Sequence, residues 1–176
     1  MKRRVSIFIC LAASFCLVSA GALRAQSLSA REKSLLQAIS KKEGEKALRL
    51  LRSSSVDVNL VDPAGRSLLM NAVASGLEDL VKELLDRGAD INAKSKEGQT
   101  ALMLAADFGH VELLRLLLSK GADYKIKDRD DWTAMQYATM RVDGSANEKK
   151  KTYEEILRIL KEAEKPPAEQ ASRRPQ

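Results

Sequence analysis

Two kinds of apolar segment alternate along the middle of the chain, and both have helical spacing. The first kind is short and rich in alanine: Ser67 can cap a helix over residues 68–74, and Gly76 can end it. The second kind is longer, ends at Gly88 and carries a stripe of apolar residues: Leu77, Leu80, Val81, Leu84 and Leu85. A polar segment at residues 62–65 has turn chemistry. The pattern predicts a turn, a short helix, a tight glycine turn and a longer helix.

The same plan returns every 33 residues. The tripeptide Gly88-Ala89-Asp90 recurs as Gly121-Ala122-Asp123, and four more positions have counterparts at this offset: Asn59 and Asn92, Gly65 and Gly98, Ser67 and Thr100, Ala72 and Ala105. A single helix pair cannot bury its apolar face, whereas stacked copies bury it against their neighbours. The period therefore predicts a solenoid of repeated helix pairs.

The start of the repeat region has the features of a terminal repeat that caps the solenoid. Residues 29–59 form a degenerate first copy, in which Ser29 and Glu32 have the spacing of a capping box. Its apolar positions lie on one helical face and its charged positions on the other, as a terminal repeat requires for solubility.

The last copy begins at Asp128 and departs from the others. Asp131 stands where the pattern has glycine. We expect residues 143–151 to form a solvated loop between its two helices, and Thr152 with Glu155 to form a second capping box after that loop. Residues 165–176 contain proline and no apolar period, which predicts a flexible tail.

Residues 29–164 resemble ankyrin repeats, most closely in three segments of the third copy: 98–106 (GQTALMLAA), 109–112 (GHVE) and 116–123 (LLLSKGAD). The resemblance implies an all-α solenoid of stacked helix-turn-helix units with short β-turn fingers. Four repeats would span about 29–61, 62–94, 95–127 and 128–164. The family usually has Thr-Pro-Leu-His at the first helix, but here Met70 and Met103 occupy the histidine positions. These joints should therefore rely on apolar contact, to which methionine adapts well.

Residues 1–25 have the three-part build of a secretory signal peptide. A basic start is followed by an uncharged apolar stretch at residues 5–18 and then by small residues, with cleavage expected after Ala22 or after Ala25. An uncleaved membrane anchor is the alternative, because residues 5–23 could just reach the ~20 residues of a spanning helix. We expect export to the periplasm, with secretion or signal anchoring as alternatives, and no membrane span after cleavage. Both cysteines lie in this segment, so the mature chain would have no disulfide.

The net charge of +6 comes from the two ends of the chain. Residues 1–25 hold four bases and no acid, and residues 165–176 hold three bases and one acid. Of 30 bases and 24 acids, 23 of each remain for the repeat region. The basic pI therefore does not indicate a nucleic-acid-binding surface, and we expect no nucleic-acid partner.

The sequence offers no catalytic constellation. His110 is the only histidine and sits at the start of a second helix, where we interpret it as structural. Without cysteine in the mature chain it lacks companions for a metal site or a nucleophile–base pair. We expect no enzyme activity, no metal and no cofactor. The favoured function is a protein–protein interaction module acting as a monomer. An immunity or protective factor for an envelope enzyme is the alternative, and a hydrolase on a repeat scaffold is least favoured.

The ankyrin resemblance implies that a protein partner lies in the concave groove made by the turn tips and first helices. Mapped onto this chain, the groove-side candidates are Arg66, Lys94, Lys96, Gln99, Asp107, Phe108, Lys127, Arg129, Trp132 and Arg141. Exposed aromatic residues beside arginine are typical of interface hot spots, which favours Phe108 and Trp132. The alternative is that both rings simply cover neighbouring turns.

Overall fold

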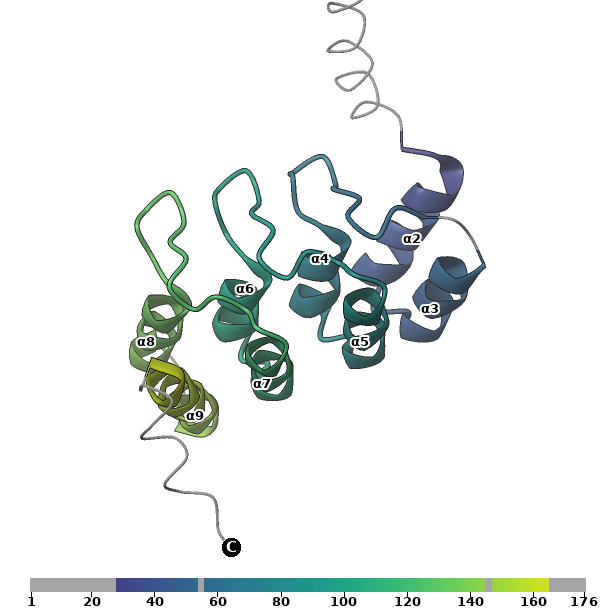
Figure 1. Ribbon diagram of the computed structural model, residues 1–176. Helices are drawn as coiled ribbons and strands as arrows, with labels where there is room; N and C mark the ends of the chain where they lie inside the picture. The colour runs from purple at the N-terminus through teal and green to yellow at the C-terminus, as the bar shows by residue number, and fades with distance from the viewer. Residues whose placement is uncertain (1–27, 54–55, 145–146, 165–176) are drawn as a thin grey trace, which may run out of the picture.

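The computed structural model describes residues 28–53, 56–144 and 147–164, and within these ranges the chain forms helices and no strand. The predicted leader and tail lie outside the described residues. The helices are α2 (Ala30–Ser40), α3 (Gly44–Arg52), α4 (Leu68–Ser75), α5 (Glu78–Asp86), α6 (Ala101–Phe108), α7 (Val111–Ser119), α8 (Ala134–Gly144) and α9 (Asn147–Glu164). They stack as four antiparallel pairs, and loops project from one side of the stack before α4, α6 and α8 (Figure 1). The predicted all-α solenoid is confirmed.

The short helices begin and end at the predicted residues. The Ser67 hydroxyl accepts a hydrogen bond from the backbone N–H of Met70 at 3.2 Å, and Thr100 does the same for Met103. Gly76 ends α4 with a left-handed backbone (φ 73°), which glycine adopts without the steric cost that a Cβ would bring. The first repeat starts on the predicted capping box, in which Ser29 and Glu32 exchange hydrogen bonds.

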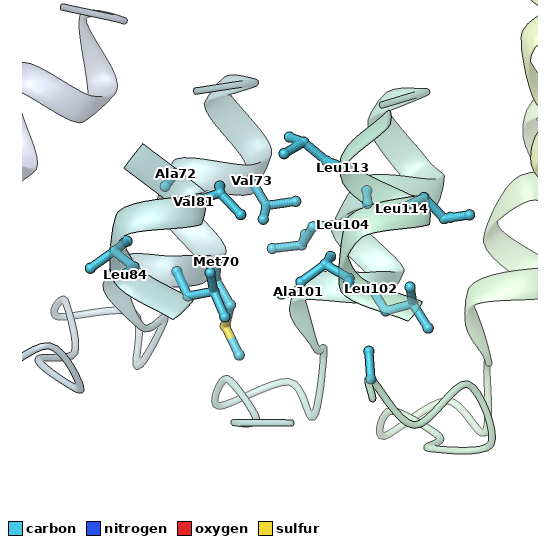
Figure 2. Packing of buried hydrophobic residues seen from close by; sticks show 14 of the residues in the cluster. Met70, Ala72, Val73, Val81, Leu84, Ala101, Leu102, Leu104, Leu113 and Leu114 are labelled. Atoms are coloured by element: carbon cyan, nitrogen blue, oxygen red, sulfur yellow. The ribbon is translucent and has the colours of Figure 1, made fainter. Parts of the chain in front are cut away.

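The core runs through the stack between the two rows of helices. Ala72, Ala105 and Ala138, one in each short helix, are fully buried, and small residues at these positions let neighbouring helices approach closely. Larger aliphatic side chains from both rows fill the space between the repeats (Figure 2). Met70 and Met103 are each only 1% exposed, which agrees with the expected apolar joints. The Met103 sulfur also accepts the Thr100 backbone N–H at 3.4 Å.

The projecting loops, here called fingers, share one turn at residues 62–66, 95–99 and 128–132. At its first position Asp62, Ser95 or Asp128 accepts a hydrogen bond from the backbone N–H four residues later, at 2.9, 3.2 and 2.9 Å. The fourth position has positive φ in all three fingers. In the last finger this position is Asp131 (φ 62°), which confirms the turn although glycine is missing.

The last repeat contradicts the expected loop. Helix α8 continues to Gly144 and α9 begins at Asn147, so most of residues 143–151 is helical. Thr152 therefore lies inside α9 and caps nothing. Lys149, Lys150 and Lys151 are good helix formers, and these exposed residues belong to the first turns of α9 where a loop was expected. The inner face of α9 joins the core, since Tyr153, Ile156, Ile159 and Leu160 are buried.

No helix in the described ranges is both long and apolar enough to cross a membrane.

Candidate functional site

Side chains tie each repeat to the next along the finger side of the stack. The Asn59 side-chain oxygen accepts the backbone N–H of Asp90 at 2.8 Å, and Asn92 accepts that of Asp123 at 2.9 Å. These bonds have the same spacing of 31 residues, so they are one contact repeated at successive joints. The repeat period that identifies the fold thus also fixes the relative position of neighbouring fingers.

The predicted groove lysines take part in this linkage. Lys96 Nζ donates to the backbone oxygen of Pro63 in the preceding finger at 2.8 Å. Lys94 Nζ donates to the backbone oxygen of Lys127 at 3.2 Å. Both side chains belong to exposed residues, so their remaining donor capacity faces solvent. They line the fingers as predicted, but they also hold them together.

A hydrogen-bonded chain connects the second and third fingers. Gln99 Nε2 donates to the Tyr137 hydroxyl at 2.8 Å, and that hydroxyl donates to Asp128 Oδ2 at 2.6 Å. Burial opposes ionisation of Asp128, but the hydrogen bonds from Tyr137 and from the backbone of Trp132 and Asp130 outweigh it and lower the pKa of this carboxyl. Burial, followed by the bond to Asp128, raises the pKa of Tyr137 to about 12. Gln99, a predicted site residue, is therefore bound into the scaffold.

Trp132 covers this chain of hydrogen bonds. Its ring meets the Tyr137 ring edge-to-face, with centroids 5.6 Å apart. Trp132 is half-buried, whereas Phe108 at the end of α6 is 51% exposed. The two aromatic candidates therefore differ: Trp132 covers the edge of the last finger, and Phe108 presents its ring to solvent.

An ion pair links the first helices of the third and fourth repeats. Arg141 Nε on α8 donates to Asp107 Oδ1 on α6 at 2.7 Å, and the Tyr153 hydroxyl on α9 donates to the Asp107 backbone oxygen at 3.0 Å. Each partner of the ion pair is followed or preceded in the chain by an exposed apolar residue, Phe108 after Asp107 and Met140 (45% exposed) before Arg141. The structure thus brings Asp107 and Arg141 together, and an exposed apolar residue adjoins each of them in the chain.

Met140 was not among the predicted site residues. Its counterpart 33 residues earlier is Asp107, itself a predicted groove position, and this offset is the signal that could have identified Met140.

The other predicted residues lie at the fingers. Arg66 pairs with Asp62 of its own finger at 3.2 Å. Lys127 is 3.7 Å from Asp131, and both are exposed. The backbone N–H of Arg129 donates to the Glu97 oxygen of the preceding finger at 2.9 Å, and Arg129 is exposed. All three are accessible at the finger edge, and their role in binding stays a prediction.

A hollow of about 460 Å³ lies at the first joint. Its lining comes from α2, the first finger and α4: Leu36, Gln37, Ile39, Ser40, Lys42, Asp62, Pro63, Arg66, Asn71, Ala74 and Ser75. Of the predicted site residues only Arg66 lies here. Burial opposes ionisation of Asp62. The hydrogen bonds from the Arg66 backbone and from Asn71, together with the Arg66 side chain, outweigh burial and lower the pKa of this carboxyl.

His110 is a packing residue in this arrangement. Its ring lies against Gly76 of the preceding repeat, where an added Cβ would come within 2.9 Å of the ring, and it stacks on Phe108 with centroids 6.2 Å apart. No group of acidic, histidine or cysteine side chains in the described ranges has the arrangement of a metal site. The geometry supports the structural interpretation of His110.

A family model described as ankyrin repeats in three copies matches residues 16–95, 35–128 and 69–167. The chain belongs to the ankyrin repeat family. No curated protein matches it. Ankyrin repeats generally act as protein–protein interaction modules and are typically not enzymes. In this ankyrin domain the exposed finger residues, Phe108 and Met140 form the candidate binding surface.

Proposed function

We propose that this ankyrin domain is a non-enzymatic binding module of the periplasm that holds a protein partner in its concave groove. The observation that carries the proposal is the exposure of two apolar residues, Phe108 and Met140, that are chain neighbours of the ion-paired Asp107 and Arg141. Apolar anchors next to an arginine suit a buried interface hot spot. The inter-repeat bonds hold this surface in place before a partner arrives, which limits the entropy lost on binding.

The compartment rests on the sequence of residues 1–25 alone. A basic start, an uncharged apolar stretch and small residues support export. Fractionation of cells that express the full chain, with immunodetection of the periplasmic fraction, tests this part. A full-length chain found only in the cytoplasm would contradict it.

Site-directed photo-crosslinking tests the groove. A photoreactive amino acid replaces Phe108 in one variant and Lys82 on the back of α5 in a control, since Lys82 is also exposed. We expect a crosslinked protein specific to position 108. An equal yield from position 82, or none from position 108 in the native envelope fraction, would contradict the groove. If the crosslinked partner is an enzyme that the ankyrin domain inhibits or stabilises, the immunity or protective role follows.

A further inference from the structure

The first helix pair, α2 with α3, is the basic end of the solenoid. Residues 29–53 hold seven Lys or Arg and three Glu, a net charge of +4. Residues 56–164 hold 16 bases and 20 acids, a net charge of −4. The zero balance of the repeat region therefore hides a separation of charge along the stack, and the basic part is the terminal pair (Figure 1).

The bases in α2 and directly after it face solvent. Arg31, Lys33, Lys41 and Lys42 are all exposed, and none of them takes part in an ion pair within the described residues. Arg31 and Lys33 lie in the first turn of α2, and Lys41 and Lys42 follow its last residue, Ser40, so these bases flank the two ends of a helix that buries Leu35, Ala38 and Ile39.

The bases of α3 surround a shallow hollow. Lys46, Arg49 and Arg52 follow one another at three-residue spacing, and together with Leu50 and Ser53 they line a hollow of about 670 Å³. Lys46 pairs with Glu43 and Arg52 with Glu83, while Arg49 Nε donates to the backbone oxygen of Glu45 at 3.4 Å. The three bases present donors around a space that an anionic headgroup can enter.

We propose that this basic cap, the exposed bases of α2 and α3, docks on an anionic phospholipid surface. Clusters of four to eight bases next to an apolar segment attract acidic lipids, and the cap has seven. The apolar stretch at residues 5–18 ends 12 residues before Ala30, a distance of at most about 40 Å in an extended chain. While that stretch is inserted in a bilayer, the cap is the part of the domain held nearest to the lipid headgroups.

This contact leaves the groove free. The cap occupies one end of the stack, whereas Phe108 and Met140 belong to α6 and α8 in the third and fourth pairs (Figure 1). The lipid contact does not rest on the proposed groove function, and either one can fail without the other.

Vesicle flotation tests the contact. The probe is the chain of residues 26–176, which retains every buried side chain of the core from Leu35 to Leu160. It is mixed with vesicles of phosphatidylglycerol and phosphatidylcholine in equal parts, or of phosphatidylcholine alone. We expect binding to the anionic vesicles only. At about 1 M salt, where the Debye length falls to about 3 Å, the binding should be lost.

Two charge variants locate the binding surface. The cap variant carries Lys33→Gln, Lys41→Gln and Arg49→Gln. The control variant carries Lys149→Gln, Lys150→Gln and Lys161→Gln on α9, which are also exposed and outside the ion pairs of the described residues. Each base near an anionic surface contributes about fivefold to affinity, so the cap variant should bind at least tenfold more weakly. The control should change less, because Glu154 and Glu155 in the same helix offset its charge.

Three outcomes would overturn the proposal. They are equal binding to neutral vesicles, no binding to anionic vesicles, and equal loss in the two variants. A mixed-sequence DNA duplex bound more tightly than the anionic vesicles would also overturn it in favour of a nucleic-acid surface. Circular dichroism of both variants checks that the fold is intact.

Discussion

The Tyr137 hydroxyl donates a hydrogen bond of 2.6 Å to Asp128, nine residues earlier, and so fastens the last finger to α8. In the second repeat Asn71 makes the corresponding bond to Asp62, at the same spacing and 3.1 Å long. A first-helix side chain thus holds a finger carboxylate in two repeats. In the last repeat the same hydroxyl also accepts from Gln99, which links neighbouring fingers.

Replacing Tyr137 should destabilise the fold. In Tyr137→Phe the half-buried Asp128 carboxylate and the Gln99 amide both lose their partner, and we expect a loss of about 1–2 kcal/mol in the free energy of unfolding. Urea denaturation measures this loss. Tyr124→Phe is the control, because Tyr124 is also half-buried and packs against the core, with the exposed Lys125 over its ring. Equal losses in both variants would argue against the network.

The phenol of Tyr137 should ionise at a higher pH than an ordinary tyrosine. The raised pKa means that its phenol stays protonated in the folded chain up to about pH 12, whereas the unfolded chain releases this proton near its ordinary value of 10.0. The stability that Tyr137 contributes is therefore present below about pH 10 and falls as the pH rises towards 12. Tyrosinate absorbance of the wild type minus that of Tyr137→Phe should show one phenol ionising at about pH 12. A difference curve centred near 10 would contradict the burial of this hydroxyl.

Asp131 offers a position for stabilisation. A backbone φ of 62° is less favourable in free energy for a residue with a Cβ than for glycine. The ion pair of Asp131 with Lys127 is exposed and long, and is therefore weak. Asp131→Gly should raise the free energy of unfolding by about 0.5–1 kcal/mol. Asp130→Gly is the matched control, since Asp130 is exposed without a positive φ and glycine there should be neutral or destabilising. Thermal denaturation distinguishes the two, and stabilisation by both would implicate lost negative charge instead.

The close approach of His110 to Gly76 can be measured against Gly88. Both glycines have positive φ, but an added Cβ would lie 2.9 Å from the His110 ring at position 76 and would meet nothing within 4 Å at position 88. Gly88→Ala should therefore cost only the backbone strain of about 1–2 kcal/mol, and Gly76→Ala should cost more. Adding His110→Ala should recover the excess in a double-mutant cycle. Equal costs at the two glycines would show that the ring moves aside freely.

The regular repeats were predictable because their signals are local. Ser67, Thr100, Gly76 and Gly109 act within one turn of chain, so the sequence alone locates the helix ends they form. The start of α9 was not predictable from the same rules. Its extra turns are polar all round, and nothing in a 33-residue pattern distinguishes a solvated helix from a solvated loop.

The candidate site was predictable only in outline. The repeat offset locates groove positions such as Lys96 and Asp107, but it does not show that Lys96 binds the Pro63 carbonyl or that Asp107 pairs with Arg141. Those contacts depend on the reach of side chains between repeats. The different exposures of Phe108 and Trp132 have the same origin, because Trp132 has the Tyr137 ring to pack against.

The affinity of the crosslinked partner for Phe108→Ala tests the groove most directly. Phe108 is half-exposed and at a helix end, so its truncation should leave the fold intact although it removes the stacking on His110, just as Trp132→Ala removes the contact with Tyr137. Removal of a hot-spot aromatic costs at least about 2 kcal/mol of binding free energy, and we predict at least a tenfold rise in Kd for Phe108→Ala by calorimetry. Lys82→Ala on the back of α5 should leave Kd unchanged. An unchanged Kd for Phe108→Ala, with Trp132→Ala also unchanged, would contradict the groove as the binding site.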